Sequence, residues 1–472
     1  MIQQKFNSYF ARLQGKTVAV VGIGVSHLPL IELLAKKGIA VIACDRRSEQ
    51  DLGETVTHLK ELNVTLKLGE DYLENLAGDV IFKTPGMRFD HPALVNAVKQ
   101  GSVLTSEMEV FFDLCPCKII AVTGSDGKST TTTLISDMLK KAGYTVHLGG
   151  NIGKPLLPEV ETIKETDIAV VELSSFQLHT MRQSPDIAVM TNLAPNHLDM
   201  HKGMEEYVDA KQNIYRYQNE HDVLVLNFDN DITAPFGKEA KGNVRYFSFH
   251  NQLADGIYYQ DDKVIDALGG TPKVLLTRED IRLPGDHNVE NYMAAIAAVR
   301  DLVKDEDILH VARNFSGGKH RIEFVDEING VRFYNDSIAS SPTRTLASIR
   351  AFDQKVHLLA GGYDKKIPFD TLGEALPDLV KALYLSGHTA AKIRTAVEQG
   401  SRYDPKTLPI YETEDFKMAV ALAYENAVPG DVVILSPACA SFDKFKNFEI
   451  RGQYFINCVK ELREKCNERK PS

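Results

Sequence analysis

The sequence predicts an α/β protein with three domains, each built on a largely parallel β-sheet that helices flank. The first observation is a recurrent unit. At three places a short β-branched strand enters a polar or glycine-containing turn, and a segment with helical periodicity follows. The second observation is the length, because 472 residues correspond to about three domains at roughly 150 residues each. We therefore predict domains at 1–112, 113–314 and 315–472.

The first unit predicts a Rossmann-like N-terminal domain. A strand at 16–21 enters a turn with Gly22 and Gly24, and a helical pattern follows. Asp45 follows the second strand, at a spacing that suits an acid contacting a ribose or a base. His27, however, occupies the place of the third glycine of the G-x-G-x-x-G pattern. The loop is therefore weak evidence for NAD, and we predict no oxidoreductase.

The second unit predicts a P-loop-type middle domain. A strand at 118–122 leads into the sequence TGSDGKST at 123–130, and a helix follows. Backbone N–H groups at such a helix start attract phosphate, and Lys128 can reach the terminal phosphates. Ser129 can offer its hydroxyl to magnesium. Val122 occupies the first glycine position of the full motif, so an ordinary strand–helix turn stays open as the alternative.

Polar side chains at the ends of neighbouring strands suggest a magnesium site and a nucleotide site. Glu172 ends a predicted strand at 168–173, and His197 follows the next strand. A carboxylate beside bound triphosphate is a natural magnesium ligand. Asn288 and Asn291 stand three residues apart at a helix start, so both amides project from one side. The alternatives are a solvated acid, a structural histidine and a helix cap.

The third unit predicts a Rossmann-like C-terminal domain. Its strand at 331–334 enters a polar turn, and further polar groups end or follow strands at 319–321, 335–337, 361–366 and 436–441. These segments supply cations, an acid and hydroxyls, which suit a ligand that carries phosphate or carboxylate. The region 228–283 is typical of short strands with polar turns, so we predict a β-rich appendage to the middle domain.

Composition and charge exclude several function classes. The net charge of −10 argues against nucleic acid or an anionic membrane surface as the main partner. Apolar runs are too short for a membrane span, and the first sixteen residues lack a signal-peptide core, so we expect a soluble cytoplasmic protein. Six cysteines do not make a disulfide scaffold in so long a chain. Cys115 and Cys117 lack a second pair at zinc spacing, so we expect reduced thiols and no zinc site.

Several segments resemble the Mur ligase family, the ATP-dependent amide-forming enzymes of peptidoglycan synthesis. They are TGSDGKST at 123–130, GGNIG at 149–153, VELSSFQL at 171–178, GDHNVEN at 285–291 and LSPACASFDKFKNFEIRG at 435–452. The resemblance covers essentially the whole chain and is strongest to the D-glutamate-adding member. It implies a cytoplasmic monomer that joins D-glutamate to UDP-N-acetylmuramoyl-L-alanine through an acyl phosphate, with ATP and two Mg²⁺ ions. We also expect domain closure, with hinges near 112 and 314.

The resemblance implies a role for each matching site residue. The ATP-binding residues would be Gly124, Ser125, Asp126, Gly127, Lys128, Ser129, Thr130, Asn288, Asn291, Arg321 and Asp336. The catalytic residues would be Lys128, Glu172, His197 and a carbamylated Lys211, and the metal ligands Ser129, Glu172, His197 and Lys211. Substrate would contact Ser26, Asp45, Arg46, Thr84, Pro85 and Gly86 at its uridine end, Asn151 and Ser174 further along, and Lys365, Ser441 and Phe448 around D-glutamate. Without the resemblance, Lys211 would be read as an exposed helix lysine.

The chain departs from the family pattern at two places. Ile338 stands where the D-glutamate-adding member commonly has lysine; Ser340 could supply a hydroxyl there, and Arg344 or Lys366 a charge. His27 stands where a glycine is usual in the uridine loop. Two alternatives therefore stay open. One is another amide ligase, either a different Mur ligase or a folylpolyglutamate synthase-like enzyme. The other is a non-catalytic relative that binds a nucleotide or a UDP-sugar.

Overall fold

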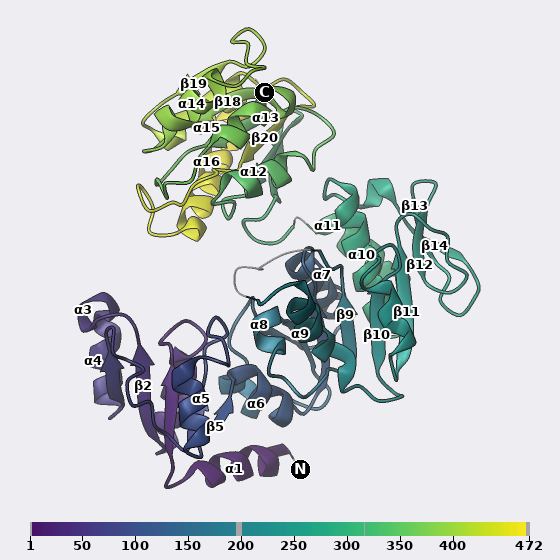
Figure 1. Ribbon diagram of the computed structural model, residues 1–472. Coiled ribbons are helices and arrows are strands. Elements are labelled where there is room, and N and C mark those ends of the chain that lie inside the picture. Colours follow the sequence, from purple (N-terminus) through teal and green to yellow (C-terminus); the bar gives the residue numbers. More distant parts are fainter. Residues whose placement is uncertain (1, 195–200, 316, 469–472) are drawn as a thin grey trace. The chain divides into compact units, whose positions relative to one another are not determined.

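Three separate β-sheets with helices around them organise the protein (Figure 1). The computed structural model describes residues 2–194, 201–315 and 317–468. It divides into two compact units, the first formed by residues 1–278 with 289–311 and the second by residues 279–288 with 312–472. The first two sheets lie in the first unit and the third sheet in the second. The predicted α/β class is confirmed, whereas the boundaries at 112 and 314 stay predictions.

The first sheet has five parallel strands in the order β3-β2-β1-β4-β5. Its strands are β1 (Thr17–Val21), β2 (Ala40–Asp45), β3 (Thr65–Leu68), β4 (Val80–Phe82) and β5 (Val103–Thr105). Its helices are α1 (Ile2–Leu13), α2 (Leu28–Lys36), α3 (Glu49–Leu52), α4 (Glu54–Glu61), α5 (Pro92–Lys99) and α6 (Glu107–Leu114). The strand order reverses beside β1, so the loops after β1 and β4 border the crevice where such sheets bind ligands.

The second sheet has nine strands in the order β14-β13-β12-β11-β10-β9-β6-β8-β7. The strands are β6 (Lys118–Thr123), β7 (Val146–Gly150), β8 (Ile168–Glu172), β9 (Ile187–Met190), β10 (Val223–Asn227), β11 (Asn243–Ser248), β12 (Ile257–Gln260), β13 (Lys263–Asp266) and β14 (Lys273–Thr277). β6 lies between β8 and β9 and is parallel to both. β12, β13 and β14 pair antiparallel, which confirms the β-rich region within 228–283.

Helices of the second sheet follow its strands. They are α7 (Lys128–Lys141), η1 (Leu157–Thr162), α8 (Ser175–Leu178), α9 (Met204–Arg216), η2 (Ala234–Lys238), η3 (Arg278–Asp280), α10 (Asp286–Val299) and α11 (Asp305–Asn314). Helix α7 follows β6, and it begins at Lys128 of the phosphate loop. This arrangement aims the first turn of α7 at whatever the loop binds.

The third sheet has six strands in the order β15-β16-β20-β17-β18-β19. Its strands are β15 (Glu323–Ile328), β16 (Val331–Asn335), β17 (Val356–Ala360), β18 (Val380–Leu385), β19 (Ile410–Glu412) and β20 (Val432–Leu435). Its helices are α12 (Pro342–Ile349), α13 (Asp370–Leu379), α14 (Ala390–Glu398), α15 (Phe416–Glu425) and α16 (Phe448–Glu468). β15 is antiparallel to β16, and the other pairs are parallel, so the sheet is largely parallel as predicted.

One apolar core runs through the first unit and joins its two sheets. It includes Phe10 of α1, Val20 of β1, Phe111 of α6 and Val171 of β8. In the second unit the neighbouring residues of each strand face opposite sides of the sheet and enter two different apolar clusters. The central strands β17, β18 and β20 are buried on both faces, as expected for parallel strands that helices cover. Among the residues that the structure describes, no helix has the length and apolarity to span a membrane.

A buried carboxylate also ties the two sheets of the first unit together. Glu107 of α6 accepts hydrogen bonds from the backbone N–H groups of Leu156 and Leu157, at 3.1 and 2.7 Å. Burial raises the pKa of Glu107 to about 7, and the two N–H donors only partly offset that rise. The contact joins the last helix of the first sheet to the start of η1, which belongs to the second sheet.

Candidate active site

The phosphate loop between β6 and α7 has a backbone that only glycine fits at two positions. Gly124 has φ +150°, and a Cβ there would lie 1.9 Å from Thr191 Oγ1. Gly127, the residue before α7, has φ +77°, and a Cβ there would lie 2.2 Å from Asn291 Oδ1. The loop therefore packs closely against two neighbouring segments, the end of β9 at Thr191 and the first turns of α10 at Asn291.

The end of β9 fixes the shape of this loop. The N–H of Ser125 donates to the carbonyl of Asn192 at 2.9 Å, and the N–H of Asp126 donates to Asn192 Oδ1 at 2.9 Å. Thr191 Oγ1 donates to the carbonyl of Asp126 at 2.6 Å. No role was predicted for Thr191 or Asn192 from the sequence. Their position at the end of a strand next to β6 was the available signal.

Lys128 lies over the loop that it follows. Its Nζ donates to the carbonyls of Gly124 and Ser125, at 2.9 and 2.8 Å. Lys128 and Ser129 are partly exposed, whereas Thr130 is buried, and all three belong to the first turn of α7. An ammonium group at the loop and N–H groups at a helix start together suit an anionic ligand such as a phosphate chain.

Glu172 presents a buried carboxylate at the end of β8, in register with Val122 of β6. Its Oε1 accepts a hydrogen bond from Asn151 Nδ2 at 2.7 Å. Within the described part of the chain, its Oε2 has no hydrogen-bond partner. A buried, unpartnered carboxylate oxygen is costly unless a cation or a donor satisfies it. Glu172 therefore fits a metal ion, and Asn151 holds it in place.

Lys211 lies inside the site and not on an exposed helix face. It belongs to α9 and is 1% exposed, and its Nζ donates to Thr123 Oγ1 and to the Gly124 carbonyl, both at 2.9 Å. Burial, and then the nearby Lys128, hold the pKa of Lys211 well below its ordinary value. The expectation from the sequence without the resemblance was wrong, because the exposure of a helix face depends on what packs against it. His197 lies outside the described residues.

The remaining predicted ATP-binding residues fall in both units. Asn291 belongs to the first unit, beside Gly127, and its Oδ1 accepts a hydrogen bond from Thr131 Oγ1 at 3.2 Å. Asn288, Arg321 and Asp336 belong to the second unit. Asn288 is buried, and its Nδ2 donates to the carbonyl of Pro284 at 2.7 Å. Within the first unit, Asn291 thus lies at the phosphate loop.

Asp336 lies buried at the end of β16. Its Oδ2 accepts a hydrogen bond from Ser436 Oγ at 2.7 Å, and its Oδ1 accepts one from the N–H of Ile322 at 3.3 Å. Burial raises the pKa of Asp336 from 3.8 to about 6, against the opposing effect of these donors. The folded chain therefore holds this proton more tightly than the unfolded chain does.

We expect this proton to make the stability of the second unit depend on pH. A raised carboxylate pKa contributes stability below the unfolded value, and that contribution is lost as pH rises through the folded value. Between about pH 4 and about pH 7, the wild type should lose roughly 3 kcal/mol relative to an Asp336→Asn variant. Urea unfolding of both chains across this range, followed by near-UV circular dichroism, measures the difference. Parallel pH profiles for the two chains would contradict it.

The crevice beside β1 holds the predicted uridine-end residues. Asp45 Oδ2 accepts a hydrogen bond from the N–H of Ile23 at 2.6 Å. Arg47 donates to both carboxylate oxygens of Asp45 and to the carbonyl of Ile23. Thr84 lies beside Gly22, because a Cβ on that glycine would meet Thr84 Cβ at 3.2 Å. The structure therefore joins the loops after β1, β2 and β4.

Two further residues complete this crevice. Arg46 was predicted from the sequence to contact substrate, and it is exposed. Arg47 was not predicted, although its position two residues after Asp45 could have indicated that it pairs with that carboxylate. His27 is buried, and its Nδ1 contacts the carbonyls of Val21 and Gly22, both at 3.1 Å. The imidazole in the place of the usual glycine thus stabilises the turn after β1. Among the other predicted uridine-end residues, Gly86 is exposed, and three are partly exposed: Ser26, Thr84 and Pro85.

Ser174 has a structural role at the start of α8. Its hydroxyl caps the helix by accepting from the N–H of Gln177 at 3.3 Å, and the Gln177 side chain accepts from the N–H of Ser174. This capping box satisfies two backbone donors at the end of the strand that carries Glu172. The predicted substrate contact of Ser174 stays a prediction.

One buried arginine links the segments of the second unit that carry two of the predicted D-glutamate residues, Ser441 and Phe448. Arg451 of α16 is 2% exposed and donates to the Ser337 hydroxyl and carbonyl, and to the carbonyls of Cys439 and Ala440. Ser337 Oγ donates in turn to the carbonyl of Phe448 at 2.8 Å. The sequence analysis missed Arg451, because an arginine within a helix usually faces solvent. The hydrogen bonds of Arg451 hold in place the segments that carry Ser441 and Phe448.

Lys365 lies beside the turn that departs from the family pattern. Its Nζ donates to Ser340 Oγ at 3.4 Å, and the loop that carries it pairs with the loop of Ser441 through Tyr363 and Ala440. Ile338 is partly buried in the same turn. A cation and a hydroxyl therefore stand next to the position where the family commonly has lysine.

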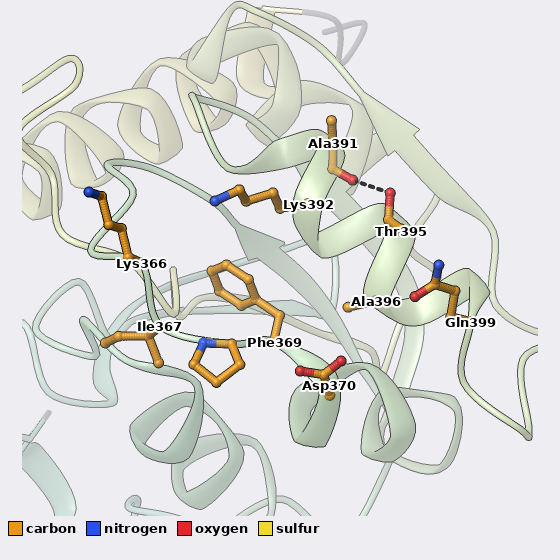
Figure 2. Close-up of a pocket in the computed structure, with 10 residues that line it drawn as sticks. Lys366, Ile367, Phe369, Asp370, Ala391, Lys392, Thr395, Ala396 and Gln399 are labelled. Atoms are coloured by element: carbon orange, nitrogen blue, oxygen red, sulfur yellow. Dashed lines mark hydrogen bonds between the residues drawn. The ribbon is translucent and has the colours of Figure 1, made fainter.

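A pocket of about 510 Å³ lies beside this loop, and among the described residues predicted for the site it contains only Lys366, which was named as a candidate charge near Ile338. Figure 2 shows its lining, in which Lys366, Ile367 and Phe369 face Lys392 and Thr395 of α14. Among the lining residues, Lys392 forms an ion pair with Asp364. We place the candidate active site at the phosphate loop, because the buried ionisable groups Glu172 and Lys211 lie there and do not line the pocket.

Known protein families and relatives are similar to this chain over almost its whole length. Family models match at residues 16–106 (Mur ligase MurD-like, N-terminal domain), 122–299 (Mur ligase middle domain) and 320–439 (Mur ligase, glutamate ligase domain). A UDP-N-acetylmuramoylalanine–D-glutamate ligase of Acetivibrio thermocellus is 54% identical over 97% of this chain and 99% of its own length. One from Clostridium novyi is 50% identical over 98% and 100%.

Solved structures share the fold at low sequence identity. The UDP-N-acetylmuramate-alanine ligase MurC of Thermotoga maritima has a TM-score of 0.57 and 17% identity, covering 95% of this chain and 100% of that one. The UDP-N-acetylmuramoylalanyl-D-glutamyl-2,6-diaminopimelate–D-alanyl-D-alanyl ligase of Acinetobacter baumannii has a TM-score of 0.56 and 16% identity, covering 90% of each chain. Together with the full-length relatives and the three matched domains, this likeness means that the chain belongs to the Mur ligase family.

Proposed function

We propose that this protein is an ATP-dependent ligase that adds D-glutamate to UDP-N-acetylmuramoyl-L-alanine in peptidoglycan precursor synthesis. The observation that carries the proposal is the 54% identity, over essentially the whole of both chains, to a relative named UDP-N-acetylmuramoylalanine–D-glutamate ligase. The phosphate loop with Lys128 supports the use of ATP. The net charge of −10 supports our further proposal that neither nucleic acid nor an anionic membrane is a partner. A cytoplasmic monomer stays a prediction.

Activation of the acceptor carboxylate is the first chemical step. An amine does not displace an oxygen from a carboxylate, because that oxygen is a poor leaving group. Transfer of the γ-phosphoryl group of ATP to the alanyl carboxylate gives an acyl phosphate and ADP. The N–H groups at the first turn of α7 would hold the phosphates, and Lys128 would leave the loop carbonyls to offset their negative charge. Asn291, beside Gly127, would contact the nucleotide.

Glu172 and Ser129 fit a magnesium ion at this loop. Glu172 offers the unpartnered, buried Oε2, and Ser129 offers a hydroxyl at the first turn of α7. Magnesium, when bound, supplies positive charge against the transferring phosphoryl group. We propose that His197 and Lys211 hold a second ion. The lowered pKa and burial of Lys211 favour the neutral amine, which can attack CO₂ and lose a proton to give a carbamate ligand.

Amide formation is the second chemical step. The amine of D-glutamate attacks the acyl phosphate carbon, and the tetrahedral intermediate collapses with release of phosphate. Lys365, Ser441 and Phe448 would position D-glutamate, and Arg451 would hold the segments that carry two of them. Ser26, Asp45, Thr84 and the segment to Gly86 would bind the uridine end, with Arg46 or its neighbour Arg47 as the cation. Positioning provides most of the catalysis, because no side chain forms a covalent intermediate.

Amino-acid specificity tests the proposed function directly. The full chain is incubated with ATP, Mg²⁺ and UDP-N-acetylmuramoyl-L-alanine, and phosphate release is measured with each amino acid in turn. We expect release with D-glutamate at least about tenfold above that with L-alanine or diaminopimelate, because the amine must be held in line with the acyl phosphate. Mass spectrometry of the nucleotide product identifies the new amide. Release with diaminopimelate or L-alanine instead would assign another amide ligase, and no amino-acid-dependent release would favour a binding protein.

A further inference from the structure

Two thiols touch at the joint between the two sheets of the first unit. Cys115 directly follows α6, Pro116 comes next, and Cys117 directly precedes β6. The two Sγ atoms are 3.6 Å apart, which is van der Waals contact for sulfur. The Cys115 thiol also donates to the carbonyl of Cys117 at 3.7 Å. The proposed ligase reaction gives neither thiol a role, so the pair is available for other chemistry.

The two thiols differ in access and in acidity. Cys115 is partly exposed, whereas Cys117 is 7% exposed. The hydrogen bond with Cys117 lowers the pKa of Cys115, against the opposing effects of burial and of Asp186. The same pairing with Cys115, and then burial, raise the pKa of Cys117. Because the thiolate is the nucleophile in thiol chemistry, Cys115 is the thiol that reacts first.

We propose that Cys115 and Cys117 form a redox-modification site, which low-molecular-weight disulfides oxidise reversibly to an intramolecular disulfide. The Cys115 thiolate attacks one sulfur of the small disulfide. A mixed disulfide forms, and the other half leaves as a thiolate that takes up a proton. Cys117 then loses its proton, and its Sγ attacks Cys115 Sγ and displaces the second small thiol. The protein loses two protons and two electrons, and the small disulfide gains them and becomes two thiols.

The contact between the sulfurs is what distinguishes this site from a pair of nearby cysteines in a flexible chain. Pro116 has a fixed φ, and its neighbours are held by α6 on one side and by β6 on the other. The pair therefore loses little conformational freedom when the bond forms. The resulting ring would join the end of α6 to the start of β6, the strand that leads into the phosphate loop.

Peptide mapping of the full chain tests the proposal. The chain is exposed to glutathione disulfide, quenched in acid, alkylated and digested with trypsin. The tryptic peptide 100–118 contains Cys115 and Cys117 and no other cysteine. We expect this peptide to lose about 2 Da, to resist alkylation, and to recover its two free thiols after treatment with a dithiol reductant. A peptide that keeps both thiols alkylatable, or that carries only stable glutathione adducts, would overturn the proposal.

Three variants and one comparison test the order of the steps and the role of the fold. Cys117→Ser should trap one glutathionyl group on Cys115, whereas Cys115→Ser should react at least about tenfold more slowly. Cys466→Ser, which changes a partly exposed thiol of the second unit, should leave oxidation of the 100–118 segment unchanged. The native chain should form the internal disulfide at least about tenfold faster than the synthetic peptide 100–118. Equal rates, or faster capture by Cys117, would refute a site prepared by the fold.

Discussion

An alanine in place of Lys128 is expected to lower D-glutamate-dependent phosphate release by about 10²- to 10³-fold, the effect of removing one group that stabilises transition-state charge. Lys128 supplies an ammonium group at the phosphate loop, where its Nζ is held by the carbonyls of Gly124 and Ser125. The Lys128 side chain contacts the backbone of the loop and is not part of the apolar core, so the variant should fold as the wild type does. Steady-state phosphate release at saturating ATP measures the loss.

Lys140 offers a matched control on the same helix. It lies in the last turn of α7, where its side chain is half exposed and pairs with Asp137 at 3.7 Å. Lys140→Ala removes the same charge from the same element, so activity should stay within about twofold of the wild type, as for most exposed positions. If Lys128→Ala retains full activity, or if the two variants lose activity equally, the assignment of the phosphate loop is wrong.

Exchanging Glu172 for glutamine should lower activity by about 10²-fold or more and raise the Mg²⁺ concentration needed for half-maximal rate. The amide oxygen can still accept the hydrogen bond from Asn151, but the position of the unpartnered Oε2 then carries an NH₂ group without charge. In the absence of Mg²⁺, the variant should be as stable as the wild type or more stable, because a buried charge is removed. Phosphate release against Mg²⁺ concentration, together with a thermal melt, measures both effects.

These opposite signs separate a metal ligand from a structural residue. A Glu172 that only supported the fold would give a less stable variant with an unchanged Mg²⁺ requirement. Glu159 provides the control, because its exposed carboxylate pairs with Lys154 and Glu159→Gln should alter neither quantity. An unchanged Mg²⁺ dependence in Glu172→Gln would remove this residue from the proposed metal site.

Features that depend on a few consecutive residues could be predicted from the sequence. The strand before the phosphate loop, the helix that begins at Lys128 and the carboxylate at the end of β8 are where the patterns placed them. A β-branched run, a glycine with positive φ and a helix period are local signals, and tertiary packing in parallel sheets reinforces them. The same locality explains why the β-rich region before α10 was also predicted.

Features that depend on burial against a distant segment could not be predicted. The helical pattern around Lys211 gives no sign that α9 packs against the end of β6, so the lysine reads as exposed. Arg451 stands in a helix 114 residues away from its partner Ser337, and only the fold brings the two together. For His27, the sequence showed a missing glycine but not that the imidazole would bind the carbonyls of the turn. In each case, the contacts of the side chain depend on how distant segments pack, which the local sequence pattern does not indicate.

The apolar cluster that spans both sheets of the first unit limits how such a chain can evolve by recombination. Phe111 and Val171 belong to one cluster although they lie on either side of residue 112. A crossover there would join two half-cores that were not selected together, and the mismatch would destabilise the hybrid. The clusters around the third sheet draw only on residues after 320. We therefore expect the part of the chain after residue 320 to be exchangeable between lineages as a cassette, whereas the first two sheets must be inherited together.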